Sequence, residues 1–276
     1  MTVAEALAHA AGRVAAFDAR LLLENASGLD AGRLLAHPET ALDRGASERF
    51  ATMLERCERG EPVAYITGSA GFYGRMFAVD PRVLIPRPET EHLVEAVLDY
   101  IRDFPVLRVR IADVGTGSGA IGITLAAENE RVEAVASDLS ADALAVASEN
   151  ARRLGLNARV RFVQGDLLEP LRELGRFDVL VANLPYVPSA SVPETPHPVG
   201  YEPRLAVDGG EDGLALYRRL LAGSAPLLSS GGALFLEAAP DTIPALADAA
   251  EAAFPTSGIE IGIDYAGLER YVTVIV

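Results

Sequence analysis

From residue 109 onward, short apolar segments alternate with longer amphipathic ones. Apolar runs of about four to eight residues predict strands, and apolar residues at spacings of three and four predict helices. This alternation predicts an α/β fold, with a parallel sheet that helices cover on both faces. The expected strands are 109–114, 132–137, 160–164, 177–182, 233–237, 259–263 and 271–276, and the expected helices are 119–127, 141–154, 214–228 and 243–254. A short connection near 264–270 predicts a closing hairpin and one antiparallel edge strand.

The chain before residue 108 has other patterns. Residues 4–17, 18–26 and 46–59 have helical spacing, which predicts a small helical domain over residues 1–62. Residues 63–67 and 76–79 predict two strands separated by glycines, so we expect residues 63–86 to form a linking β-hairpin. A further helix is expected over 89–104, at the start of a main domain that spans residues 87–276.

A glycine-rich turn follows the first strand of the alternating region. It consists of Asp113, Val114, Gly115, Thr116, Gly117, Ser118 and Gly119. Glycines let the backbone turn tightly and approach a ligand closely, and open α/β sheets bind ligands at this end of their strands. Asp138 ends the next strand and can accept hydrogen bonds from both hydroxyls of a ribose. Asp166 ends the third strand and could reach an adenine amino group.

Two cofactor classes fit this turn. Gly115, Gly117 and Ala120 match the dinucleotide fingerprint, with an acid about twenty residues further on, so a nicotinamide enzyme is one candidate. However, the charge of Asp113 would oppose a pyrophosphate and would suit a cationic amine, and Asp166 adds a third acid. A ligand with an ammonium group, a sulfonium group and one nucleoside fits three carboxylates better. We therefore expect S-adenosylmethionine (S-adenosyl-L-methionine) as the cofactor.

A second turn follows the fourth strand and consists of Asn183, Leu184, Pro185 and Tyr186. Pro185 biases Leu184 toward an extended conformation and so restricts the direction of its carbonyl group. The side-chain oxygen of Asn183 and the Leu184 carbonyl can then point at one spot, where they would bind an NH2 group. Tyr186 supplies an aromatic face on which a planar amide or base can stack.

Such a turn can support methyl transfer to nitrogen. An amide or aniline-type nitrogen is a poor nucleophile because its lone pair is delocalised. Two acceptors that hold both N–H bonds pull the nitrogen toward tetrahedral geometry and stabilise its developing positive charge. In-line positioning supplies much of the remaining acceleration, and the proton can leave afterwards to water. We therefore expect these four residues to form the catalytic turn.

Charge and composition exclude other classes. The chain has 24 basic residues, all arginine, and 39 acidic ones, for a net charge of −15. An acidic surface repels phosphate, so we expect no direct nucleic-acid binding and no docking to anionic membranes. Cys57 is the only cysteine, which excludes a disulfide framework and a cysteine-based zinc site. With four scattered histidines and no apolar run of about 18 residues, we expect no metal, no membrane span and a cytoplasmic location.

Several further motifs carry a resemblance to a known family. Besides the two turns, they are Gly60–Pro62, Tyr65–Gly68, Phe72–Gly74, Val83–Glu91, Tyr201–Pro203, Gly209–Gly210, Asp212–Leu214 and the closing segment Asp264–Arg270. With them the chain resembles, over nearly its whole length, the release factor glutamine methyltransferases. That family methylates the glutamine amide of the Gly-Gly-Gln motif in peptide chain release factors.

The resemblance implies a seven-stranded Rossmann-like S-adenosylmethionine methyltransferase sheet, with the N-terminal helices as the domain that docks the release factor. It also implies roles for matching residues of this chain. Residues Gly115–Gly119 correspond to the cofactor loop, Asp138 to the ribose ligand, and Asp166 with Leu167 to the adenine contacts. Asn183–Tyr186 corresponds to the substrate-amide site, with Asn183 also next to the cofactor.

The chain departs from the family pattern at two places. The family usually has Asn-Pro-Pro-Tyr, whereas Leu184 stands at the second position here and keeps the backbone carbonyl. The stretch Ala238–Pro240 lacks an expected glycine. Asn-Leu-Pro-Tyr is also similar to the motif of ribosomal-RNA adenine dimethyltransferases. An RNA or DNA adenine N6-methyltransferase is therefore the main alternative, beside a nicotinamide oxidoreductase and a catalytically silent binding module.

Overall fold

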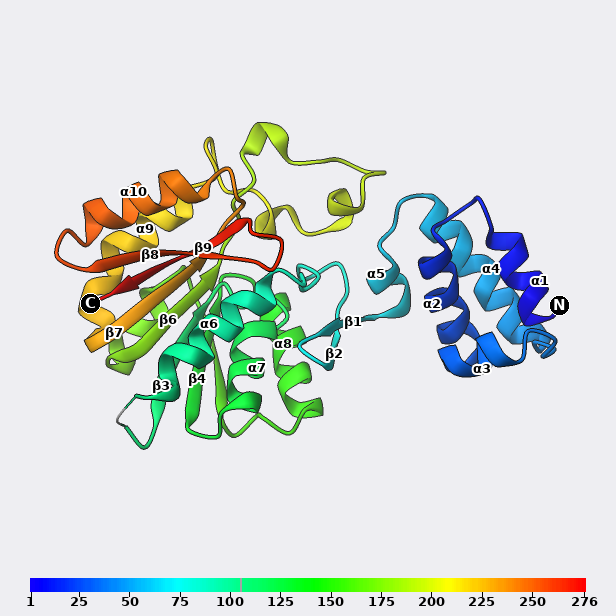
Figure 1. Ribbon diagram of the computed structural model, residues 1–276, viewed down its shortest axis with the longest axis horizontal. Coiled ribbons are helices and arrows are strands. Elements are labelled where there is room, and N and C mark those ends of the chain that lie inside the picture. The colour runs from blue at the N-terminus through cyan, green and yellow to red at the C-terminus, as the bar shows by residue number, and fades with distance from the viewer. Residues whose placement is uncertain (105) are drawn as a thin grey trace. The chain divides into compact units, whose positions relative to one another are not determined.

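The computed structural model describes residues 1–104 and 106–276. The described chain forms two compact units, which can be followed by residue colour in Figure 1. The first, called the helical unit here, comprises Met1–Ser69 and Pro193–Tyr201. The second, called the sheet unit, comprises Ala70–Val192 and Glu202–Val276. None of the helices in the described ranges is both long and apolar enough to cross a membrane.

The helical unit packs short helices around one apolar core. Its helices are α1 (Val3–Ala10), α2 (Ala16–Ser27), α3 (Ala31–Ala36), α4 (Arg44–Glu58) and α5 (Val63–Thr67). Leu22 of α2 and Phe50 of α4 are fully buried in this core. Asp30 and Asp43 cap α3 and α4, because each carboxylate accepts a hydrogen bond from a first-turn backbone N–H group.

Two expectations for this region are wrong. The helix expected over residues 4–17 ends at Ala10, and Gly12 then adopts a φ of +78°, which favours glycine. Residues 63–67 form the helix α5 and not a strand. Val63 and Ile66, three residues apart, both pack on the helical core. A short apolar run is ambiguous because periodicity alone does not distinguish a strand from a buried helix.

A distant segment, Pro193–Tyr201, completes the helical unit. The Tyr201 hydroxyl donates a hydrogen bond of 2.7 Å to the backbone carbonyl of Arg59, just after α4. The backbone of Pro196 lies so close to Gly60 that a Cβ atom there would stand 1.8 Å from the Pro196 carbonyl oxygen. Gly60 also has a φ of +88°, so both its conformation and its contact require glycine.

The sheet unit contains a seven-stranded sheet, with its strands in the spatial order β5-β4-β3-β6-β7-β9-β8. The strands are β3 (Val109–Val114), β4 (Val132–Asp138), β5 (Val160–Gln164), β6 (Phe177–Asn183), β7 (Leu228–Glu237), β8 (Gly258–Ile263) and β9 (Glu269–Ile275). The helices are α6 (Thr90–Arg102), α7 (Ala120–Glu128), α8 (Ala141–Arg153), α9 (Ala215–Ser224) and α10 (Ile243–Ala253). This arrangement confirms the expected α/β class and the Rossmann-like topology.

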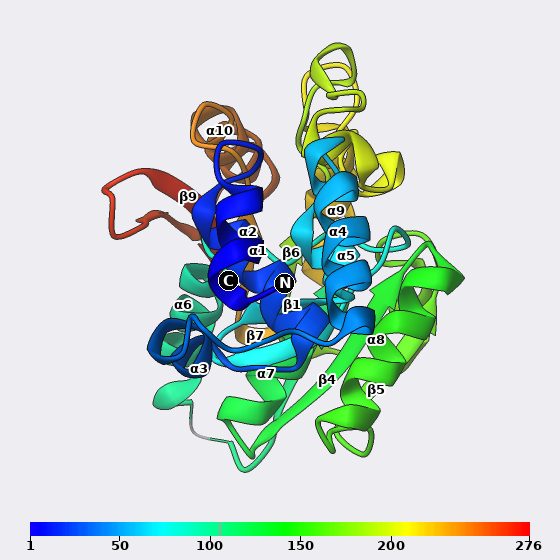
Figure 2. The ribbon, with the colours of Figure 1, turned by 90° about the vertical axis from the view of Figure 1, so that its right-hand side faces the viewer.

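Helices cover both faces of the sheet, as expected from its continuous apolar strands. Alternate residues of β6 face opposite cores: Leu180 packs in the core with α9 and α10, and Val181 in the core with α6 and α7. Figure 1 shows α9 and α10 on one side of the sheet, and Figure 2 shows α7 and α8 beside β4 and β5. β3, which precedes the glycine loop, is therefore an interior strand of a sheet that helices cover on both faces.

The antiparallel strand is not at the edge. β9 runs antiparallel between β7 and β8, and β8 forms the edge. Val272 and Val274 of β9 are fully buried, whereas β8 is half-buried or exposed along its length. The hairpin itself was expected, but the pattern of two neighbouring strands does not specify which of them joins the main sheet.

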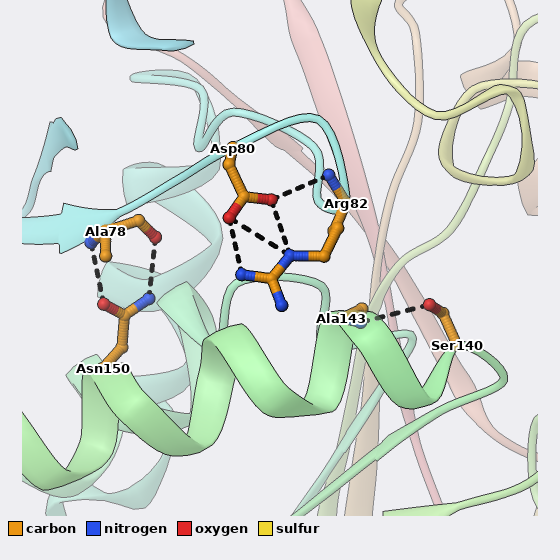
Figure 3. Close-up of polar contacts among 6 residues, drawn as sticks. All are labelled: Ala78, Asp80, Arg82, Ser140, Ala143 and Asn150. Atoms are coloured by element: carbon orange, nitrogen blue, oxygen red, sulfur yellow. Dashed lines mark hydrogen bonds and ion pairs between the residues drawn. The ribbon is translucent and has the colours of Figure 1, made fainter. Parts of the chain in front are cut away.

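A separate hairpin, β1 (Ser69–Phe72) and β2 (Arg75–Ala78), is fixed to α8 by Asn150. The Asn150 side chain accepts a hydrogen bond from the Ala78 N–H group (2.7 Å) and donates to the Ala78 and Ser118 carbonyl groups (3.0 and 2.9 Å). Figure 3 shows the paired contacts with Ala78, beside the ion pair of Asp80 with Arg82. One buried amide therefore joins the hairpin to the glycine loop.

We predict that Asn150→Asp destabilises the fold by about 1–3 kcal/mol, because a carboxyl group cannot donate to both carbonyl oxygens. The loss should grow as pH rises through the raised pKa of the new carboxyl, since its charged form faces two carbonyl oxygens. Urea unfolding at several pH values measures the effect. Asn157→Asp is the control because Asn157 is exposed after the same helix. Equal stability of the two variants would contradict this role of Asn150.

Candidate active site

The loops that follow β3, β4, β5 and β6 surround one cavity of about 250 Å3. It lies beyond the carboxyl ends of the strands, where the chain order reverses between β3 and β6, which is the usual binding crevice of such sheets. Of the residues expected at the site, the wall includes Gly115, Thr116, Gly117, Ser118, Asp138, Asp166, Leu167, Asn183, Leu184 and Pro185. The structure therefore brings the two predicted turns together at one cavity.

The glycine loop rests on Asp113, which is fully buried beneath it. The Asp113 carboxylate accepts hydrogen bonds from the Thr116 hydroxyl (2.6 Å) and from the Gly122 N–H group in the first turn of α7 (2.9 Å). Burial raises the pKa of Asp113 to about 6, although these hydrogen bonds oppose the shift. Asp113 is not among the residues that line the cavity, so its role is to stabilise the loop through these hydrogen bonds.

The loop leaves room on its open side. Gly117 has a φ of +56°, and a Cβ atom added there would meet nothing within 4 Å. A Cβ atom on Gly115 would instead stand 2.7 Å from Cδ2 of Leu184. The loop is therefore open toward the cavity at Gly117, while at Gly115 it contacts the second turn directly.

Asp138 presents a carboxylate at the cavity wall. Its oxygens accept hydrogen bonds from the N–H groups of Gly117 and Ser140, both at 2.9 Å. Burial raises the pKa of Asp138 above its ordinary value, and these backbone donors oppose that shift. The carboxylate therefore has a fixed orientation, and its remaining acceptor capacity is available for ligand hydroxyls.

Three arginines line the described wall, and each is paired with a carboxylate. Asp80 pairs with Arg82, Glu202 with Arg87, and Asp166 with Arg219 at 2.5 Å. At the start of α7, where a dinucleotide fold would bind its pyrophosphate, the Gly122 N–H group already binds Asp113. These pairs favour a nucleoside ligand without phosphates over a dinucleotide.

Asn183 is held by side chains from two other elements. Its amide nitrogen Nδ2 donates to Oγ1 of Thr90 (3.0 Å) and to Oε1 of Glu237 (2.8 Å). Thr90 begins α6 and Glu237 ends β7, and both side chains are buried. Because both N–H bonds of Asn183 are used, its side-chain oxygen is the atom left for a ligand.

Tyr217 of α9 fixes the backbone of the same turn. Its hydroxyl oxygen accepts from the Leu184 N–H group (3.0 Å), and its O–H group donates to the backbone carbonyl of Glu237. The Leu184 carbonyl oxygen lies 3.1 Å from the same hydroxyl. A proline at position 184 would have no N–H group to donate, so this contact depends on the leucine of this chain.

Three of the expected site residues do not line the cavity: Asp113, Gly119 and Tyr186. Gly119 precedes α7 with a φ of +84°. Tyr186 is half-buried, and burial, assisted by the charge of Glu237, raises its pKa to about 12. In the part of the chain that the structure describes, no group of three His, Cys, Asp or Glu residues could hold a metal ion.

The sequence did not reveal Thr90, Glu237 and Tyr217, which support the turn, or the ion pair of Arg87 with Glu202 at the cavity wall. Thr90 and Arg87 lie in the Val83–Glu91 segment, whose only sequence signal is its resemblance to the family. Glu237 had a weak signal, because it is a carboxylate at the end of an apolar strand, as the expected site residue Asp138 is. Nothing in the local sequence distinguishes Tyr217 from other helix core residues.

Comparison with protein families gives two matches along the chain. Residues 2–68 match the PrmC N-terminal domain, and residues 108–206 match a methyltransferase domain. A release factor glutamine methyltransferase of Moorella thermoacetica is 47% identical, over 98% of this chain and 97% of that protein. Another of the same description from Bradyrhizobium diazoefficiens is 42% identical, over 86% and 80% of the two chains.

Solved structures agree on the fold. The catalytic domain of human Mettl16 in complex with a MAT2A 3′UTR hairpin superposes with a TM-score of 0.55 at 15% identity, over 82% of this chain and 81% of that one. A methyltransferase from Pyrococcus furiosus gives 0.52 at 18% identity, over 82% and 98% of the two chains. At such identities the likeness supports the architecture alone.

We predict that Tyr217→Phe costs about 1–3 kcal/mol of folding stability, because it leaves the Leu184 N–H group and the Glu237 carbonyl group unpaired in a buried site. Leu184→Pro removes that N–H group, so Tyr217→Phe should cost less in the Leu184→Pro background. Urea unfolding of the wild type, both single variants and the double variant measures the difference. Strictly additive costs would show that Tyr217 does not act through the Leu184 N–H group.

Proposed function

Because this chain belongs to the release factor glutamine methyltransferase family, we propose that it methylates the glutamine side-chain amide of a peptide chain release factor, with S-adenosylmethionine as the methyl donor. The acceptor in this proposal is the glutamine of the Gly-Gly-Gln motif. One observation carries the assignment: both N–H bonds of Asn183 are bound inside the protein, and Asn183 lines the cavity. We therefore assign its side-chain oxygen to an N–H bond of the substrate.

The cavity suits this cofactor by the chemistry of its wall. We assign the ribose hydroxyls to Asp138, the adenine to Asp166 and Leu167, and the remaining part to the loop Gly115–Gly119 that Asp113 braces. When bound, S-adenosylmethionine supplies an electrophilic methyl group on a sulfonium centre. The paired arginines leave the wall without an unmatched positive charge that would repel a cationic ligand.

The acceptor turn activates the amide by binding it. We assign the two N–H bonds of the substrate amide to the Asn183 side-chain oxygen and the Leu184 carbonyl. Both acceptors are more favourable to a nitrogen that is becoming positive than to a neutral amide, so they stabilise the transition state more than the ground state. No residue of this chain must act as a base, because the proton of the methylated nitrogen can leave to water.

The partner is a protein in this proposal. The helical unit matches the PrmC N-terminal domain, and we assign to it the docking of the release factor. The net charge of −15 disfavours direct binding to a nucleic acid or an anionic membrane. A cytoplasmic location follows from a substrate that works on the ribosome.

We predict that Asn183→Ala lowers kcat for release factor methylation by about 100- to 1000-fold, because one of two preorganised acceptors is lost. Binding of S-adenosylhomocysteine, measured by calorimetry, should remain roughly unchanged. Labelled S-adenosylmethionine and a purified release factor provide the assay.

The acceptor is tested in the same assay. A release factor whose Gly-Gly-Gln glutamine is replaced by alanine should incorporate no label. Incorporation that persists in this substrate would refute the proposed acceptor, and transfer to an RNA or DNA adenine in its place would support the adenine methyltransferase alternative.

A separate prediction concerns Asp138. Asp138→Asn should weaken S-adenosylhomocysteine binding by about 10- to 100-fold, since hydrogen bonds to a charged group are lost. Asp142→Asn, an exposed residue of α8, is the matched control. Calorimetric titration with NAD should give no comparable heat. Tight NAD binding, or equal binding by the two variants, would overturn the assignment of this cavity.

A further inference from the structure

Glu237 occupies an unusual place beside the acceptor turn. It ends β7 directly opposite Asn183 in the pairing of β6 with β7, and only 4% of it is exposed. Its Oε1 atom accepts hydrogen bonds from both Asn183 (2.8 Å) and Thr90 (3.0 Å). Its Oε2 atom is buried and has no hydrogen-bond partner among the described residues. A carboxylate buried in this way has a high desolvation cost, and no ion pair within the described ranges offsets it at hydrogen-bond distance.

The contacts of Glu237 impose one orientation on the Asn183 amide. An amide has a donor end and an acceptor end of nearly the same shape, so packing alone does not choose between them. With the nitrogen inward, both N–H bonds meet the oxygens of Glu237 and Thr90. With the oxygen inward, it would face a carboxylate oxygen, and the nitrogen would present its hydrogens to the cavity.

We propose that Glu237 is a positioning residue that, with Thr90, selects the Asn183 orientation whose oxygen faces the substrate and strengthens that oxygen as an acceptor. The substrate part of this inference rests on the proposed function, whereas the orientation of Asn183 does not. A negative charge on Glu237 polarises the amide through Nδ2 and increases the electron density on Oδ1. The turn therefore becomes a better acceptor when Glu237 is ionised.

The surroundings of Glu237 place its ionisation near neutral pH. Burial raises the pKa of Glu237 to about 7; nearby Glu89 raises it further, and the Thr90 hydrogen bond and Arg270 lower it. Two tyrosines also face it, Tyr186 and Tyr217, whose pKa values are both raised and lie far above this range. Activity through Asn183 should therefore rise with pH as Glu237 loses its proton.

The first test needs no substrate. In 15N-labelled protein, the side-chain NH2 signals of Asn183, assigned by their absence in Asn183→Ala, should shift with a midpoint near pH 7. Glu237→Gln should abolish the shift. Arg270→Gln should move the midpoint to higher pH and Glu89→Gln to lower pH, because these charges act on Glu237 with opposite signs. Signals that do not titrate, or titrate alike in Glu237→Gln, would overturn the proposal.

The second test is kinetic. The value of kcat for release factor methylation should rise by roughly tenfold through this midpoint in the wild type. In Glu237→Gln, which retains a neutral acceptor, kcat should be lowered and the rise absent. Glu260→Gln, on the exposed edge strand β8, is the matched control and should retain the wild-type profile. A profile shared by wild type and Glu237→Gln would assign the titration elsewhere and contradict the inference.

Variants of Thr90 keep the proposal testable if Glu237 variants fold poorly. Thr90→Val removes the hydroxyl and should lower kcat while leaving S-adenosylhomocysteine binding unchanged, and Thr90→Ser should restore kcat. Equal kcat values in the two variants would refute this part. If the wild type fails to methylate any release factor but the Asn183 signals titrate as expected, the proposed function fails and the positioning role stands.

Discussion

Hydrogen bonds between buried side chains at the ends of β6 and β7 are the constraint on which the site depends. An unpaired polar group costs about 1–3 kcal/mol in a dry interior, which favours arrangements that pair such groups. Asn183 and Thr90 both donate to Oε1 of Glu237, whereas Oε2 of Glu237 has no partner among the described residues, and Tyr217 joins the backbones of the two strand ends. The contacts that complete the folded core thereby also determine which atoms of the turn face the cavity.

The two halves of the site are built on one rigid frame. The glycine loop and the acceptor turn follow adjacent parallel strands, β3 and β6, and the Leu184 side chain packs against Gly115. The Asp113 carboxylate binds the glycine loop through the Thr116 hydroxyl, and the Glu237 carboxylate binds the acceptor turn through the Asn183 amide. Both are buried carboxylates with raised pKa values. Methyl transfer needs a donor and an acceptor in line, and this frame fixes both relative to the sheet.

The sequence predicts those site residues whose role follows from their position at the end of a strand. The glycine loop, Asp138 and the Asn183–Tyr186 turn are recognisable because they follow strand ends, where the α/β fold brings ligands. Thr90, Glu237 and Tyr217 were not predicted, since their roles arise from contacts between segments far apart in the chain. The same reason explains the other differences: α5 is helical because of the core it meets, and β9 lies inside the sheet because of how the hairpin docks.

The segment Pro193–Tyr201 gives the chain a further property. It leaves the sheet unit a few residues after the acceptor turn, joins the helical unit against Arg59 and Gly60, and returns at Glu202. The helical unit is therefore not formed by one continuous segment that ends at residue 69. If recombination between homologous genes replaced residues 1–69 alone, Gly60 and Pro196 would come from different parents and their close contact could be lost. We therefore expect Met1–Ser69 and Pro193–Tyr201 to be inherited together.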